Sequence, residues 1–344
     1  MFKKTLYSTV IAILIFAILG VFLPHDVHVE RHITIQRPAV TVFTVLNSYH
    51  YFMSWSPWAG RDPAAVTQIS GPQRGVGAKM SWRGNPRLVG SGWQEIIESR
   101  PNSLLRMHLE FDQQGAAESY FGIEPSASGV RVTWGFDADL REGQSILGGF
   151  LAGYFALFFD HWIGADYERG LAGLKFLVES MPAADFAGLE VQMVEAEPHD
   201  ILYVSTEEDG GPADLSPDLA AAYREITAFM TLNAIDRAAQ PMAIMHVDGE
   251  NRYELQAAIP VVSRDFETSG RIRAGHSPAG RALRVSHFGP YRDLSRSYDR
   301  LAAWMAARGI AAGSVSWEHY ISDPGKTDPE NLITHIYMQV ADDS

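Results

Sequence analysis

The stretch HFGPYRDLSRSYDRLAAWM, residues 287–305, contains a strand end, a turn and a helix in succession. Gly289 and Pro290 favour a turn after the strand-like residues before them. The residues after the turn have apolar side chains at helical spacing, and Gly309 is a typical helix C-terminus. The apolar positions are Tyr291, Leu294, Tyr298, Leu301 and Met305. The stretch therefore predicts a strand that leads directly into an amphipathic helix.

The same order of elements occurs earlier in the chain. The strand-like run ILYVS (201–205) precedes a helix that starts at Ser216-Pro217, an N-cap residue followed by proline. The apolar stripe of that helix is Leu219, Tyr223, Ile226 and Met230. Two further strands follow each helix: PMAIMH and RYELQAAIPV in the first half, SVSWEHY and LITHIYMQV in the second. The pattern predicts a duplicated βαββ domain. We expect both helices on one sheet face and a pseudo-twofold groove on the other.

Residues 189–342 resemble the GyrI-like domain, an effector-binding module also found at the end of some AraC- and MerR-type regulators. The motifs that carry the resemblance are HFGPYRDLSRSYDRLAAWM, WEHYISDP and THIYMQV, in this order. The resemblance implies an α+β domain with a small-molecule pocket. In those regulators a helix-turn-helix domain precedes the module. Here a different domain does, so we do not expect a transcription factor.

Residues 28–180 form a second region of strands and helices. The run HVERHITIQ alternates as a strand, and PAVTVFTVLNS after it reads as a short helix. Strand-like runs with glycine punctuation follow, up to GVRVTWGFDADL. The region ends in FFDHWIGADYERGLAGLKFLVES (158–180), which predicts a long helix. One helix across a curved antiparallel sheet leaves a cavity between them, which suits an apolar ligand.

This region resembles the SRPBCC superfamily, the START-related and polyketide cyclase-like domains with a helix-grip fold. The stretches that carry the resemblance are ITIQRPAVTVFTVLNSYHYFMSWSPW, GVGAKMSW, GVRVTW and ADYERGLAGLKFLVE. That fold hosts lipid carriers and cyclases, so the resemblance implies the fold more than an activity. The apolar run ILGGFLAGYFALFF (146–159) is too short to span a membrane. It predicts a buried or lid-like segment over the cavity mouth, with a lipid-facing surface as the alternative.

The N-terminus predicts a membrane anchor over residues 1–24. Lys3 and Lys4 precede the uncharged run LYSTVIAILIFAILGVFL (6–23), and about 18 helical residues just span a hydrocarbon core of about 30 Å. In a bacterial cell, the positive-inside rule places the lysines in the cytoplasm. We therefore expect a single-pass inner-membrane protein whose two domains face the periplasm. A cleaved secretory signal is the alternative.

Composition excludes several classes of protein. The formal net charge of −13 argues against nucleic acid as a partner, because phosphate binding needs a basic face. The chain has no cysteine, which excludes disulfides and thiolate metal sites. His25, His28 and His32 have ligand spacing only in a helix, but Pro24 and the alternation after it favour extended chain. We therefore expect neither a metal nor a cofactor.

Glu318 is the main candidate for a ligand-binding residue. On a strand, Glu318 and Tyr320 point one way and Trp317 the other. A carboxylate among aromatic rings suits a lipophilic cation. The GyrI-like resemblance adds that Glu318 matches the position where drug-binding relatives place the acidic residue of their pocket. A solvated glutamate at a strand end is the alternative.

Four aromatic residues complete the predicted ligand site: Trp304, Trp317, Tyr320 and Tyr337. For Trp304, core packing is the alternative role. We expect the protein to bind hydrophobic or cationic small molecules without catalysis. Two alternatives stay open: a pocket enzyme, cyclase-like or hydrolysing reactive toxins, in which Glu318 activates water; and an interaction scaffold in the envelope.

Overall fold

The structure is a computed structural model that describes residues 16, 20, 22–112, 115–141, 146–208, 217–248, 252–263 and 266–341. It divides into two compact units, Met1–Asp185 and Phe186–Ser344. We call these the N-terminal and the C-terminal unit. Both combine one antiparallel sheet with helices, so the predicted α+β class is confirmed.

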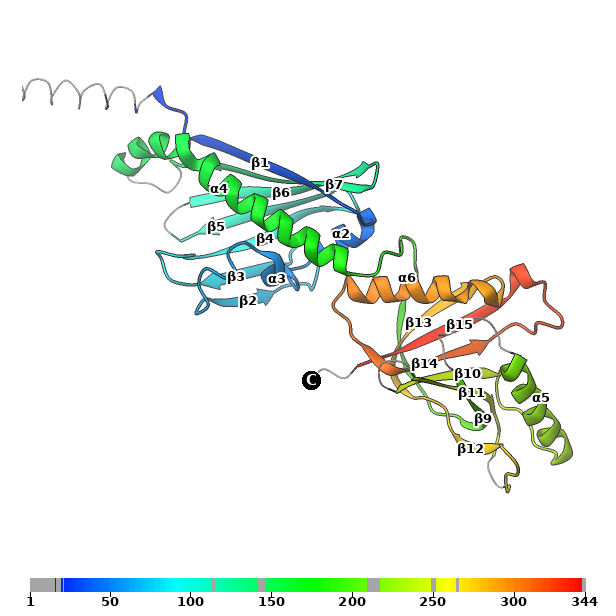
Figure 1. The fold of residues 1–344 in the computed structure, drawn as a ribbon. Helices are drawn as coiled ribbons and strands as arrows, with labels where there is room; N and C mark the ends of the chain where they lie inside the picture. Colours follow the sequence, from blue (N-terminus) through cyan, green and yellow to red (C-terminus); the bar gives the residue numbers. More distant parts are fainter. Residues whose placement is uncertain are drawn as a thin grey trace, which may run out of the picture. The chain divides into compact units, whose positions relative to one another are not determined.

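The N-terminal unit is a seven-stranded antiparallel sheet with one long helix across it (Figure 1). The strand order is β1-β7-β6-β5-β4-β3-β2. The strands are β1 (Asp26–Ile35), β2 (Val66–Ser70), β3 (Lys79–Arg83), β4 (Ser91–Arg100), β5 (Leu104–Phe111), β6 (Gly115–Ser126) and β7 (Gly129–Asp139). The helices are α2 (Ala39–Leu46), α3 (Phe52–Trp55) and α4 (Ile146–Ser180). Strands β2 to β6 therefore each pair with the next strand in the sequence. Strand β7, the last, pairs with β1, which forms one edge of the sheet.

Helix α4 is held on the sheet by β1 and by an aromatic core. Arg31 of β1 forms ion pairs with Asp160 and Glu168 of α4, each with an N–O distance of 3.0 Å. Tyr167 of α4 stacks on Trp134 of β7 with ring centroids 3.8 Å apart. These contacts fix the helix over the sheet.

The apolar run 146–159 is the first part of α4 and not a separate lid. Its side chains are described from Leu151 onward; Ala152 is buried and Phe155 is exposed. Among the described residues, no helix is long and apolar enough to cross a membrane. The predicted anchor at 1–24 lies almost wholly outside the described residues.

The C-terminal unit is an eight-stranded antiparallel sheet whose order follows the duplication. The order is β12-β9-β11-β10-β14-β15-β13-β8. The first half consists of β9 (Asp200–Glu208), α5 (Pro217–Leu232), β10 (Met242–Asp248) and β11 (Arg252–Pro260). The second half consists of β13 (Gly280–Phe288), α6 (Leu294–Ala306), β14 (Ala312–Tyr320) and β15 (Ile333–Val340). Short strands β8 (Gln192–Ala196) and β12 (Arg273–His276) form the edges.

The two halves meet at the pair of β10 and β14, where Ala243 lies opposite Glu318. Both helices pack on the same face of the sheet: α5 buries Leu219 and Ile226 against β9 and β11, and α6 buries Leu301 against β13 and β15. A separate apolar cluster around Trp317 covers the other face. Glu318 therefore lies at the centre of the sheet, on the face that carries the helices.

Candidate functional site

Glu318 is enclosed by tyrosines from both halves of the C-terminal unit. Its side chain is 6% exposed. The Tyr298 hydroxyl of α6 donates to Oε1 at 3.0 Å, and the Tyr320 hydroxyl donates to Oε2 at 2.8 Å. Tyr223 of α5 and Tyr291, just before α6, pack edge-on to the Tyr320 ring at centroid distances of 6.3 and 5.2 Å. We call these four residues the tyrosine cage.

The electrostatics of this cage shift the protonation equilibrium of Glu318 toward the uncharged form. Burial raises the pKa of the Glu318 carboxyl, while the hydrogen bonds from Tyr320 and Tyr298 lower it by less. No lysine, arginine or histidine nitrogen in the described part of the chain forms an ion pair with this carboxylate. Burial and the nearby carboxylate also raise the pKa of Tyr298. The cage is therefore a buried acidic site without a counter-ion of its own.

The structure divides the five predicted site residues into three groups. Glu318 and Tyr320 lie together in the cage, as the strand alternation predicts. Trp317 is 2% exposed and stacks on Tyr337 at 5.1 Å on the opposite face of the sheet. Trp304 packs at the edge of the α6 cluster, with the guanidinium of Arg308 4.0 Å from its ring centroid.

Three cage tyrosines were not predicted as site residues: Tyr223, Tyr291 and Tyr298. All three belong to the predicted apolar helix stripes, where leucine or isoleucine would pack as well. Their hydroxyl groups are the signal that could have identified them, because a buried tyrosine hydroxyl needs a hydrogen-bond partner.

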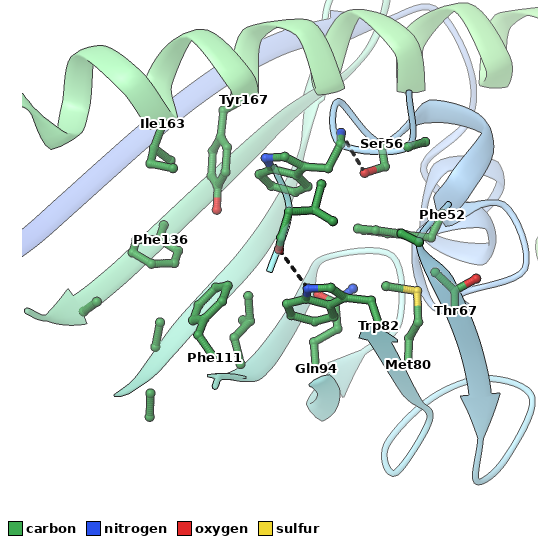
Figure 2. Close-up of a pocket in the computed structure, with 18 of the residues that line it drawn as sticks. Phe52, Ser56, Thr67, Met80, Trp82, Gln94, Phe111, Phe136, Ile163 and Tyr167 are labelled. Carbon is green, nitrogen blue, oxygen red and sulfur yellow. Dashed lines mark hydrogen bonds between the residues drawn. The ribbon is translucent and has the colours of Figure 1, made fainter. Parts of the chain in front are cut away.

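The N-terminal unit contains a cavity of about 270 Å³ between α4 and the sheet. Its wall is mostly aromatic and apolar. Figure 2 shows Tyr167 and Ile163 pointing from α4 into the cavity, while Trp82 and Gln94 reach it from the sheet. An adjoining pocket of about 30 Å³ also borders Gln94 and is large enough for one or two waters.

Gln94 of β4 is the unpaired polar group in this wall. Its side chain is 6% exposed, and its amide forms no side-chain hydrogen bond with another described residue but keeps surface that is open to the cavity. Asp62 also lines the cavity, but its carboxylate already accepts the backbone amides of Ala64 at 3.2 Å and Asn85 at 2.7 Å. Gln94 therefore keeps both a donor and an acceptor for whatever fills the cavity.

The ionisable side chains in the cavity wall are all acidic. Its carboxylic acids are Asp62 and Asp139, and the described lining contains no lysine, arginine or histidine. A carboxylate inside would lose its hydration without gaining a cation, which is costly. The cavity is therefore unsuited to anionic ligands. The sequence alone assigned no residue to this cavity. Gln94 lies in the strand-like run GWQEIIE, and this pattern does not show whether its side-chain amide has a hydrogen-bond partner.

Comparison with known families agrees with these two architectures. Residues 26–179 match the family described as polyketide cyclase / dehydrase and lipid transport. Residues 190–341 match the GyrI-like small molecule binding domain. The chain therefore joins a polyketide cyclase-type domain of the SRPBCC superfamily to a GyrI-like domain, in the order that the motifs predict.

Several solved structures are similar to parts of the chain. The C-terminal domain of EcmrR is 20% identical over 45% of this chain and 98% of its own, with a TM-score of 0.39. Protein CV1439 from Chromobacterium violaceum is 15% identical over 44% of this chain and 97% of its own, with a TM-score of 0.33. Aha1 from Colwellia psychrerythraea is 17% identical over 44% and 96%, with a TM-score of 0.32. At these values the likenesses carry no conclusion about function. No curated protein matches the chain significantly.

Proposed function

We propose that this protein is a non-enzymatic binding protein that holds a mostly apolar, uncharged small molecule in the cavity of its N-terminal unit. The observation that carries the proposal is the unpaired amide of Gln94 in the wall of a cavity of about 270 Å³. A hydrocarbon that displaces water from this amide leaves it unsatisfied, which costs about 1–3 kcal/mol. A ligand with one carbonyl or hydroxyl group avoids this cost.

Three naphthalene probes test this proposal: naphthalene, 2-acetylnaphthalene and 2-naphthoate. We expect the ketone to bind about tenfold more tightly than the hydrocarbon, since one recovered hydrogen bond is worth about 1.4 kcal/mol. The carboxylate should bind most weakly. Binding is measured by calorimetry with the full chain, and a thermal shift in the N-terminal unit serves as a second readout.

Gln94→Leu should remove the advantage of the ketone while keeping hydrocarbon binding. Gln68→Leu is the matched control, because Gln68 lies on the exposed strand β2. Equal affinities of ketone and hydrocarbon for the unaltered protein would mean that only water satisfies Gln94. A preference for the ketone that persists in Gln94→Leu would place the hydrogen bond elsewhere. Either result contradicts the proposed role of Gln94.

A second binding function is favoured by the tyrosine cage. A lipophilic cation would supply the counter-ion that Glu318 lacks, and each aromatic face adds about 0.5–2 kcal/mol. Tetraphenylphosphonium is a suitable probe, with uncharged triphenylphosphine oxide as the matched control. Because the cation binds the ionised carboxylate, its affinity should rise with pH until Glu318 is ionised in the free protein. Loss of cation binding in Glu318→Gln, with the oxide unaffected, is the expected result; equal binding of both probes refutes it.

The enzyme alternative uses the same cage and predicts turnover. Glu318 would then orient or deprotonate a water beside an electrophilic ligand. Glu318→Gln would abolish that turnover without loss of the fold. Binding requires less exact geometry than catalysis, so we retain binding as the function.

We further propose that residues 6–23 anchor the chain in the inner membrane, with both units in the periplasm. The apolar run and the two preceding lysines support this placement. The full chain should resist alkaline carbonate extraction from membranes, and protease added to spheroplasts should digest both units. A chain that is extracted, or protected in intact spheroplasts, contradicts the anchor or its direction. The acidic net charge of −13 supports the exclusion of nucleic acid as a partner.

A further inference from the structure

The first half of α4 exposes a row of large aromatic side chains. Phe155, Phe158 and Trp162 are 56%, 58% and 53% exposed. Their spacing of three and four residues places them on one side of the helix. The rings of Phe158 and Trp162 stack at a centroid distance of 6.2 Å. We call these three residues the aromatic face; large exposed aromatic clusters mark interaction surfaces.

The aromatic face lies beside the second half of the N-terminal apolar run. The ring of Phe16 stacks on Tyr154 of α4 at 4.2 Å. The side chain of Leu23 lies against Gly153, where an added Cβ atom would come within 2.7 Å of it. Figure 1 shows the start of β1 next to the first turns of α4. Phe16 and Leu23, both in the second half of the run 6–23, are therefore adjacent to this part of the helix.

The exposed side of α4 changes character along its length. Asp160, between Phe158 and Trp162, is exposed and paired with Arg31, and within two turns beyond Trp162 Glu168 and Arg169 are both exposed. Phe176 is 81% exposed but lies 18 residues after Phe158, which is five full turns and about 27 Å along the same side of the helix. The aromatic face is thus confined to the end of α4 that adjoins the N-terminal run.

We propose that the aromatic face of α4 lies at the boundary between the headgroups and the acyl chains of the bilayer that residues 6–23 span, since Phe16, inside that run, contacts Tyr154 of the same helix turns. Tryptophan is favoured at membrane interfaces because its ring is apolar and its N–H is polar, and phenylalanine adds apolar burial. Helix α4 itself is not apolar enough to cross. Because the face is tethered next to the anchor, docking is intramolecular, and a small surface is sufficient.

Docking at this surface would let the cavity take its ligand from the bilayer. Phe159 and Ile163 belong to the same turns as the aromatic face but line the cavity on the other side of the helix. An α-helix with its side chains is about 10–12 Å thick. The cavity therefore lies about one helix diameter from the bilayer, where uncharged apolar molecules are concentrated. This inference rests on the proposed anchor but not on the identity of the ligand.

The absence of cysteine allows a direct test with single-cysteine variants of the full chain. Phe158→Cys and Trp162→Cys report on the aromatic face, and Phe176→Cys is the matched control on the same side of α4. Each variant carries an environment-sensitive fluorophore and is reconstituted in phosphatidylcholine vesicles with or without a lipid that bears a nitroxide near the headgroup. We expect quenching at positions 158 and 162 to be at least threefold stronger than at position 176.

Several outcomes would overturn the proposal. A label at position 158 that is open to aqueous iodide means that the face is in water. A label shielded from iodide but not quenched by the nitroxide lipid means that protein covers the face, either the chain's own N-terminal segment or a second copy. Equal quenching at position 176 means that contact is unspecific. Flotation with the vesicles distinguishes the proposed anchor from the proposed docking. A chain that does not float refutes the anchor. A chain that floats but whose label at position 158 is open to iodide refutes only the docking.

Discussion

Replacing Glu318 by glutamine should stabilise the C-terminal unit, and the gain should grow with pH. Burial raises the pKa of Glu318 above its usual value of 4.5, so the folded protein holds a proton that the unfolded chain has already lost. The stability that Glu318 contributes is present below pH 4.5 and is lost as the pH rises through the folded-state pKa. Glutamine imitates the protonated acid and does not titrate.

The magnitude follows from proton linkage. Between the unfolded and the folded pKa, the unaltered protein loses up to about 1.4 kcal/mol of unfolding free energy per pH unit relative to Glu318→Gln. Above the folded pKa the difference is constant. Below pH 4.5 the two proteins should differ by less than about 1 kcal/mol, because the amide can keep one hydrogen bond with Tyr298 or Tyr320. Tyr298→Phe should widen the pH range over which the difference grows. The substitution removes a hydrogen-bond donor that lowers the pKa of Glu318 in the folded protein.

Urea denaturation at pH 4, 5, 6, 7 and 8, followed by near-ultraviolet circular dichroism, measures this difference. Glu330→Gln is the matched control, since its side chain is 71% exposed and its effect should be small at every pH. A Glu318→Gln effect that does not depend on pH would refute the reasoning. If Glu318→Gln is instead less stable than the unaltered protein, and increasingly so as the pH rises, the tyrosine cage holds Glu318 ionised.

Three further substitutions test the packing that positions the two sites. Trp317→Ala should cost about 3–5 kcal/mol in urea denaturation because the ring is 2% exposed; a cost below 1 kcal/mol contradicts its core position. Gly129→Ala should destabilise the N-terminal unit by more than about 1 kcal/mol, because Gly129 has φ +136° and an added Cβ atom would lie 2.2 Å from the Ile35 carbonyl oxygen; Gly60→Ala, with no atom within 4 Å, should be near neutral. Asp166→Asn should cost about 3–5 kcal/mol, since this buried carboxylate accepts hydrogen bonds from two guanidinium groups and an indole; an unchanged melting temperature would contradict that role.

Strand periodicity was sufficient to orient the residues of β14. Alternation predicts that Glu318 and Tyr320 share one face and Trp317 the other, and the hydrogen bond between Tyr320 and Glu318 agrees with it. Periodicity could not predict which face becomes the ligand site. We expected the groove on the face without helices, but Glu318 lies on the face that carries α5 and α6. Only the packing of α6 brings Tyr298 to the carboxylate.

In the N-terminal unit, the sequence predicts the cavity but not the hydrogen bonding of its polar side chains. The closing helix across a curved sheet predicts a cavity under α4, and Tyr167, which stacks on Trp134, forms part of its wall. The run GWQEIIE also predicts that Gln94 alternates with its neighbours. Whether a buried amide is paired depends on atoms from other strands, and these are set by the register of β3, β4 and β5. Local pattern therefore predicts the wall of the cavity but not its free polar group.

The two proposed binding functions differ in the charge of the ligand. The proposal gives neutral molecules to the cavity, which offers an uncharged amide and no cation to a carboxylate. It gives cations to the tyrosine cage, which offers a buried carboxylate. A weakly basic amphiphile exists in both forms, and its neutral form suits Gln94 while its protonated form suits Glu318. Lower pH increases the cationic share of such a ligand but also protonates Glu318, and these effects oppose each other. Cation binding at the cage is therefore expected to be strongest between the pKa of Glu318 and that of the ligand, whereas binding in the cavity should only increase with pH.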